Sequence, residues 1–242
     1  MNRLIYIIIA TILVSLFSSC QNADKKATVT EVKYSGALRT IMSGNIKPVI
    51  SLDSFSNKKH LYALGAVENL EGEIQIFNSK PSNSFVVDSS LHIKDEYNLK
   101  AALLVYAEVE EWNEFIIKNS TTKDNIEKAI FEIAKINGVN LDKPFPFLLE
   151  GTAESLDWHV IKWIDGDTIH THKKHKASGL NGRLTNRTVA VLGFYSTKHK
   201  AVFTHHTTNV HMHFKTLDNS VAGHIDDIRL NTITLSLPKS KK

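Results

Sequence analysis

His211 and His213 are separated by one residue, and His224 follows after a short polar stretch. Alternate residues of a β-strand share a face, so a strand here places His211 and His213 on the same side. Between the histidines, Asp218 and Asn219 suit the positive φ angles of a two-residue hairpin loop. A hairpin symmetric about that pair sets His213 opposite His224, with Cβ atoms about 4.5–5.5 Å apart. The spacing predicts three imidazoles on one face of a β-hairpin.

Three neutral imidazoles with an open fourth position are the donor set of a catalytic zinc, and other divalent metals accept the same ligands. The alternative is a histidine-rich surface hairpin that binds nothing, because the sequence contains 12 histidines. The facing register of the third histidine favours the metal site. A second His-x-His pair, His170 and His172, has no third partner in a matching register, and we expect both to face solvent.

Glu73 is the second residue with candidate chemistry. It begins an alternating segment, 73–77, in which Glu73 and Gln75 share one face, and a turn separates this segment from an apolar strand over 61–67. A carboxylate in this place can bind a metal or transfer a proton, or it can lie at a solvated strand end. The local sequence alone favours the solvated end.

The remaining pattern predicts a mixed α+β fold with few helices. Apolar stripes at helical spacing predict a helix over 30–45 and a second helix that is capped by Thr121-Thr122 and stops at Gly138. The run Pro144-Phe145-Pro146-Phe147 is expected to break regular structure and to separate two sheet-based halves, residues 32–143 and 144–237. The metal hairpin lies in the second half. Further strands are expected in the segments 84–87, 101–109, 158–164, 188–194 and 228–237.

Composition excludes some classes of function. The chain has 242 residues, of which 42% are hydrophobic and 22% charged, which is typical of a globular protein with a sizeable core. The formal net charge is only +4, and no stripe of Lys and Arg is interleaved with aromatic residues. We therefore expect no nucleic-acid partner.

The N-terminus predicts export. Arg3 precedes an apolar run, 4–17, which has the length of a signal-peptide core and is too short to span a membrane. Ser18 and Ser19 before Cys20 resemble a bacterial lipobox, which implies a lipoprotein signal over 1–19 and lipidation of Cys20. The alternative is a plain secretory signal in which Cys20 is incidental. Residues 20–31 would be a flexible tether, and the lipid anchor the protein's one contact with the membrane.

Several segments, in this order along the chain, resemble the α-acetolactate decarboxylase family, and the resemblance covers about residues 32–230. The most specific of them is the histidine motif itself. The segments are Leu64-Gly65-Ala66-Val67-Glu68-Asn69-Leu70-Glu71-Gly72-Glu73, Pro144-Phe145-Pro146-Phe147, Val191-Leu192-Gly193-Phe194-Tyr195-Ser196, and His211-x-His213 with Gly223-His224-x-x-Asp227.

The resemblance implies a small-molecule substrate and the conversion of acetolactate to acetoin by a zinc-dependent carboxy-lyase. Zinc would be held by His211, His213 and His224, and Glu73 would be the catalytic acid of the Gly-Glu motif, which reverses the local interpretation. Asp227 would orient an imidazole through its other ring nitrogen.

Two features of the family are not found. No arginine follows Phe147 before Arg183, although Arg183 or Arg187 could take the place of the family's substrate-facing arginine, and the family's glutamate on a longer C-terminal tail has no counterpart before Lys242. Two other functions therefore stay open: a metal-dependent ester hydrolase on the same site, and an exported lipoprotein that binds a metal or small ligand without turnover. The sequence does not decide between a monomer and a homodimer.

Overall fold

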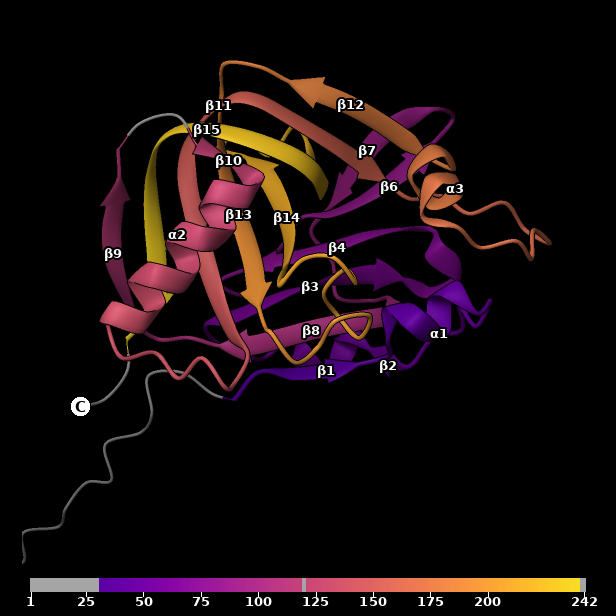
Figure 1. Ribbon diagram of the computed structural model, residues 1–242. Helices are drawn as coiled ribbons and strands as arrows, with labels where there is room; N and C mark the ends of the chain where they lie inside the picture. Colours follow the sequence, from indigo (N-terminus) through magenta and orange to yellow (C-terminus); the bar gives the residue numbers. More distant parts are fainter. Residues whose placement is uncertain (1–30, 119–120, 240–242) are drawn as a thin grey trace, which may run out of the picture.

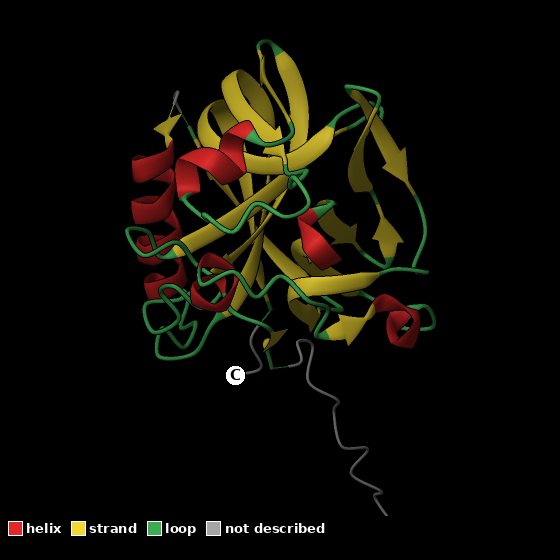
Figure 2. Cartoon of the chain, turned by 90° about the vertical axis from the view of Figure 1, so that its right-hand side faces the viewer, coloured by secondary structure: helices red, strands yellow, loops and turns green. Residues whose placement is uncertain are grey.

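Two antiparallel β-sheets make up most of the computed structural model, which describes residues 31–118 and 121–239. The first sheet has the strand order β1-β8-β3-β4-β6-β7, with β2 beside β8 and β5 beside β4. The second has the order β10-β15-β14-β13-β11-β12, with β9 beside β15. Figure 1 shows the first sheet in indigo to purple beside the orange and yellow strands of the second, and the few helices stand out in red in Figure 2. The predicted mixed α+β class is confirmed.

The strands of the first sheet are β1 (Lys33–Ser35), β2 (Ile50–Ser51), β3 (Leu61–Val67), β4 (Gly72–Phe77), β5 (Lys80–Pro81), β6 (Asn83–Val87), β7 (Ser90–Lys94) and β8 (Lys100–Glu108). Those of the second are β9 (Trp112–Ile117), β10 (Thr121–Thr122), β11 (Phe145–Val160), β12 (Leu180–Leu184), β13 (Arg187–Tyr195), β14 (Val210–Thr216) and β15 (Ala222–Pro238). The α-helices of the described residues are α1 (Leu38–Met42), α2 (Lys123–Ile136) and α3 (His172–Ala177).

The chain passes from the first sheet to the second between β8 and β9, earlier than the predicted boundary at 143/144. β9 and β10 both pair with β15, and α2 follows β10 directly. The expected break at Pro146 does not occur, because Pro146 lies inside β11. There β11 pairs with β13, and its pairing with β15 begins only at Leu148, so the missing N–H of Pro146 interrupts no ladder on that side.

The second sheet is rolled up around its own core. β11 pairs with both β13 and β15, and β15 pairs in turn with β14, so β11, β13, β14 and β15 follow one another in a closed ring. Met212, Phe214 and Ile225 are buried in this core, together with Ile126 and Ile130 of α2. Because side chains alternate along a strand, the neighbours of Met212 and Ile225 lie on the other face of the sheet.

That other face packs against the first sheet. Leu192 and Phe194 of β13 are buried in one cluster with Tyr62 and Leu64 of β3. In the hairpin of β3 and β4, Ile74 lies in a separate core behind the first sheet. The residues on either side of Ile74 therefore face the second sheet, and they are Glu73 and Gln75.

The predicted helix over 30–45 is wrong in its first half. Lys33–Ser35 forms β1, which pairs with β8, and Gly36 has a φ of 80° where the chain turns against the backbone of Ala102. Only Leu38–Met42 is helical. Pairing at the sheet edge overrides the apolar stripe here. The predicted second helix is confirmed as α2, which begins directly after Thr122 and ends before Gly138.

None of the helices within the described residues is long and apolar enough to cross a membrane. The predicted signal segment, the tether up to residue 30 and the lipidation residue Cys20 lie outside the described residues.

Candidate metal centre

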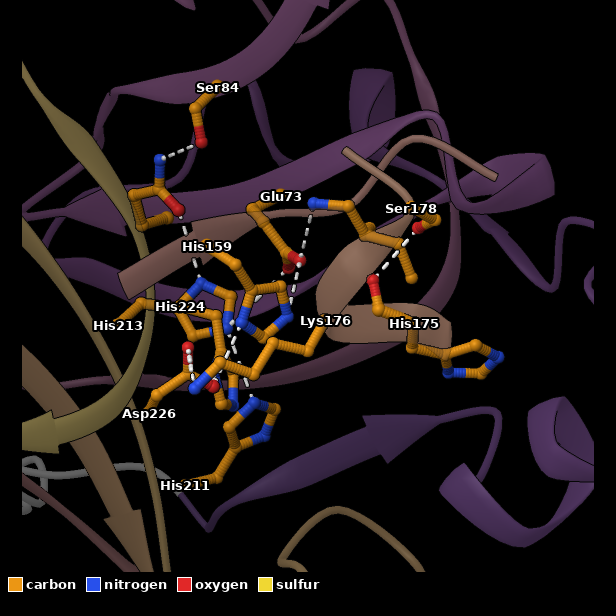
Figure 3. Close-up of polar contacts among 12 residues, drawn as sticks. Glu73, Ser84, His159, His175, Lys176, Ser178, His211, His213, His224 and Asp226 are labelled. Atoms are coloured by element: carbon orange, nitrogen blue, oxygen red, sulfur yellow. Dashed lines mark hydrogen bonds and ion pairs between the residues drawn. The ribbon is translucent and has the colours of Figure 1, made fainter. Parts of the chain in front are cut away.

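The histidine hairpin folds in the predicted register. β14 and β15 pair with His213 opposite His224, and Asn219 in the connecting turn has a φ of 54°. The rings of His211, His213 and His224 lie 5.0, 5.2 and 5.3 Å apart, centroid to centroid. One ligand nitrogen from each histidine falls within 4.8 Å of the other two. The three imidazoles therefore converge, as Figure 3 shows.

The donor set fits a single divalent cation. The Nε2 atoms of His211 and His213 are 3.2 Å apart, close to the roughly 3.3 Å that a tetrahedral zinc with Zn–N bonds of about 2.0–2.1 Å would set. Burial lowers the pKa of His211 to about 4 and lowers the pKa of His213 and of His224 well below 6.5. All three rings are therefore neutral at pH 7, which is the form that binds metals.

Gln75 fixes the tautomer of His213 from the opposite sheet. Its side-chain amide donates to the hydroxyl of Ser84 at 3.1 Å and to the carbonyl of Ser82. The amide oxygen is thereby turned toward His213, where it lies 3.1 Å from Nδ1. Since that oxygen can only accept, Nδ1 carries the proton and Nε2 keeps its lone pair for a metal.

Glu73 lies beside the three imidazoles and is buried, with 5% of its surface exposed. Its carboxylate is 3.8 Å from Nε2 of His213, and it accepts a hydrogen bond of 3.3 Å from the backbone N–H of Ile161. Burial raises the pKa of Glu73 to about 7, against the opposing effects of His159 and of the Ile161 N–H. A carboxyl group with this pKa can both hold and release a proton near neutral pH.

A fourth histidine, His159, extends the site onto a third strand. His224 pairs with His213 on one side and with His159 of β11 on the other, so the three form one row across the sheet. Nδ1 of His159 is 3.0 Å from the carboxylate of Asp226, and its Nε2 is 3.9 Å from Glu73. His159, His224 and Asp226 form a second group with ligand atoms close together.

The acidic residue next to the imidazoles is Asp226, whereas sequence analysis assigned that position to Asp227. Asp227 is exposed, and Asp226 lies 3.9 Å from Nδ1 of His224. The register between β11 and β15 shifts at this point: Trp158 pairs with Ile225 and Asp157 with Asp227, so Asp226 is left unpaired in a bulge.

All of these groups except His213, Gln75 and Asp227 line a cavity of about 280 Å³ between the two sheets. Its apolar wall comes from α1, β3 and the strands of the second sheet, and its titratable groups face the same space. They are Glu73, Lys123, His159, His172, His175, His205, His211, His224 and Asp226.

No arginine lines this cavity within the described part of the chain. Arg183 forms ion pairs with Asp157, and Arg187 with Asp218, at the exposed surface. Neither therefore replaces the family's arginine. Of the second His-x-His pair, His172 is exposed as expected but lies at the cavity wall, whereas His170 is half-buried and stacks on Trp163 with ring centroids 4.4 Å apart.

Sequence analysis missed four of these residues: Gln75, Lys123, His159 and Asp226. Gln75 had a local signal, because it shares a strand face with Glu73. His159 had none, because its place in the site depends on pairing between β11 and β15, which are far apart in the sequence. Lys123 was counted only as part of an amphipathic helix.

Comparison with solved structures places this arrangement in a known fold. The structure superimposes on α-acetolactate decarboxylase from Bacillus subtilis strain 168 with a TM-score of 0.70 and 13% sequence identity, over 88% of this chain and 86% of that one. The enzyme from Bacillus subtilis subspecies spizizenii gives a TM-score of 0.70, with 14% identity over 88% and 87% of the two chains. The protein has the acetolactate decarboxylase fold.

A Staphylococcus aureus protein of unknown function similar to α-acetolactate decarboxylase has the same fold, with a TM-score of 0.67, 12% identity and coverage of 88% and 87%. Neither a family model nor a curated protein matches the sequence. Sequence identities of 12–14% show that these proteins have the same fold, but they do not show the same activity. The chemistry has to be argued from the residues in the cavity.

Proposed function

We propose that this protein is a metal-dependent decarboxylase of a small 2-hydroxy-3-oxo acid of the acetolactate type, with zinc as the first candidate metal. The observation that carries the proposal is the position of Glu73. A buried carboxyl group with a pKa of about 7 lies 3.8 Å from one of three convergent imidazoles, inside a cavity of the acetolactate decarboxylase fold. A site that only stores metal has no need of a proton carrier at this place.

The reaction has one bond to break and one proton to supply. The bond between the hydroxyl-bearing carbon and the carboxylate breaks, carbon dioxide leaves, and the electron pair spreads onto the neighbouring ketone oxygen. When bound by His211, His213 and His224, a divalent metal supplies the Lewis acidity that stabilises negative charge on that oxygen. A proton added to the same carbon then gives acetoin, so each turnover consumes one proton.

Glu73 is placed to deliver that proton. About half of its carboxyl groups are protonated near pH 7, because burial raises the pKa to about 7. A bound cation would lower this pKa, and the desolvated pocket opposes that effect. His159, whose Nδ1 is held by Asp226, turns its Nε2 toward Glu73 at 3.9 Å. This pair is placed to exchange a proton with Glu73.

The test is acetoin release from acetolactate by the zinc-loaded protein, compared with a Glu73→Gln variant. Gln keeps the size of the side chain and an oxygen for the Ile161 N–H, but it cannot transfer a proton. We expect kcat to fall by about 10²–10⁴, the usual contribution of general acid–base catalysis, while zinc stoichiometry is unchanged. Equal kcat values would remove Glu73 from the reaction.

The same assay separates the alternatives. Hydrolysis of aryl esters without acetoin release would assign the site to a metal-dependent hydrolase, in which Glu73 acts as base toward water. Stoichiometric zinc without turnover of either substrate would indicate a binding protein.

We also propose that the protein is an exported lipoprotein attached to a membrane through Cys20. The support is the sequence alone: Arg3, the apolar run 4–17 and the small residues before Cys20. Fatty-acid labelling of the full chain that persists in a Cys20→Ser variant would contradict this assignment.

A further inference from the structure

Lys123 is an unusual residue for its position. It is the first residue of α2, where the partial positive charge of the helix N-terminus favours an acidic side chain. The side chain is half-buried, and burial lowers the pKa of its ammonium group, against the opposing effect of Asp226. The helix N-terminus and the burial of the side chain both oppose a cation at this place. Such local conflicts are concentrated at functional sites.

Lys123 lines the cavity, and its ammonium group has bonding capacity to spare. Its Nζ donates to the backbone carbonyl of Asp226 at 2.8 Å, which is its one hydrogen bond to the described residues. An ammonium group has three donors. Lys123 lines the cavity together with His211 and His224, and its charge contributes to lowering the pKa of both.

Lys176, the other lysine near Asp226, is different. Its Nζ is 3.1 Å from the Asp226 carboxylate, and it does not line the cavity. Its charge is therefore matched within the protein. No described carboxylate lies within ion-pair distance of the Lys123 ammonium group, although nearby carboxylates, Asp226 first among them, act on its charge from further away. The ammonium group can therefore still pair directly with an anion supplied by the ligand.

We infer that Lys123 binds the carboxylate of the substrate, in the cavity that it lines together with His211 and His224. This inference rests on the proposed function, since it adds a carboxylate group to what the cavity recognises. It also explains how a site without a cavity-lining arginine selects an acid. Lys123 is a positioning residue for the carboxylate that leaves.

The kinetic effect of Lys123 follows from the change in charge of the substrate carboxylate during the reaction. The carboxylate is a full anion in the bound substrate and becomes neutral carbon dioxide as the bond breaks. An ammonium group therefore stabilises the ground state at least as well as the transition state, and its loss raises KM without lowering kcat in proportion. For a hydrogen bond to a charged group we expect a KM increase of about 10- to 100-fold.

The experiment combines turnover with binding of two compounds that do not react. Calorimetry of the zinc-loaded protein compares 2,3-dihydroxy-2-methylbutanoate with 2-methylbutane-2,3-diol, which has a methyl group in place of the carboxylate. We expect the wild type to prefer the acid about 10- to 100-fold. Lys123→Gln should lose this preference, and Lys123→Arg should retain part of it. Lys128→Met is the matched control, because Lys128 is an exposed lysine on α2 outside this cavity.

The outcomes separate this inference from the proposed function. If the wild type releases no acetoin but prefers the acid through Lys123, the decarboxylase proposal fails and the carboxylate site stands. If acetoin is released and Lys123→Gln keeps the KM and the acid preference of the wild type, the inference is overturned. A wild type that does not distinguish the acid from the diol also overturns it. Zinc stoichiometry of each variant shows that the site is folded.

Discussion

Replacing Gln75 with leucine tests the central geometric argument, that the first sheet prepares the metal site on the second. Gln75 is fully buried and touches His213 on one side and Ser82 and Ser84 on the other. Leucine has a similar volume but can neither accept nor donate a hydrogen bond. Nδ1 of His213 then has no acceptor, and the ring is free to carry its proton on Nε2, the nitrogen that faces the other imidazoles.

The expected loss has two separate parts. Partners of metal-binding histidines contribute about 10- to 100-fold in affinity, or about 1.4 to 2.8 kcal/mol. Zinc affinity should fall by that factor. In addition, the Ser82 carbonyl and the Ser84 hydroxyl lose a donor in a buried place, which costs about 1–3 kcal/mol each in free energy of unfolding.

Two measurements separate the loss of zinc affinity from the loss of stability. Competition with a chromogenic chelator gives the zinc affinity, and urea denaturation of the metal-free protein gives the stability. Gln75→Glu is the control: a carboxylate still accepts from Nδ1 of His213, but it cannot donate to Ser82. We expect this variant to lose stability and keep its zinc affinity, whereas Gln75→Leu loses both.

A folded Gln75→Leu variant with wild-type zinc affinity would refute the tautomer argument. Equal losses of zinc affinity in Gln75→Leu and Gln75→Glu would refute it as well, because the two differ in the acceptor offered to His213.

Two further predictions concern the metal-free protein. Burial lowers the pKa of His211 from 6.5 to about 4, so the unfolded chain binds more protons in this range. The free energy of unfolding should have its full value above pH 6.5 and decrease as the pH falls toward 4. His211 accounts for roughly 3 kcal/mol of this decrease. Urea denaturation at several pH values measures this, and His211→Asn should flatten the decline. Gly193→Ala would place a Cβ on the buried ring of Phe147; we expect a loss of roughly 1–3 kcal/mol, and an unchanged Tm would contradict this packing of β11 on β13.

The parts of the site that depend on local geometry were predictable. A short turn determines the register of a hairpin, so Asp218 and Asn219 were enough to place His213 opposite His224. The same holds for the shared face of Glu73 and Gln75, which follows from the two-residue period of a strand. The failure over 30–45 has the opposite cause: an apolar stripe is compatible with a helix or with an edge strand, and pairing with β8 decided between them.

The burial of Glu73 could not be predicted from the local sequence. The alternation in β4 is typical of a strand with one solvated face, and the local interpretation followed it. In the structure that polar face is covered by the second sheet, so Glu73 is desolvated and its pKa rises to about 7. The family resemblance predicted Glu73 as a residue of the site, and the structure places it beside His213. The physical reason for its raised pKa appears only when the two sheets are packed together.

The assignment of Asp227 came from the family resemblance, and strand periodicity alone would have selected Asp226. Strict alternation from His224 puts Asp226 on the histidine face and turns Asp227 away, as the structure shows, although a bulge leaves Asp226 without a partner on β11 and the pairing resumes at Asp227. The sequence does not show this bulge, which becomes visible only in the register between β11 and β15. The Asp226 carboxylate lies 3.0 Å from His159 and 3.9 Å from His224, while Lys176 balances the charge. Asp226 therefore lies beside both His159 and the three convergent imidazoles.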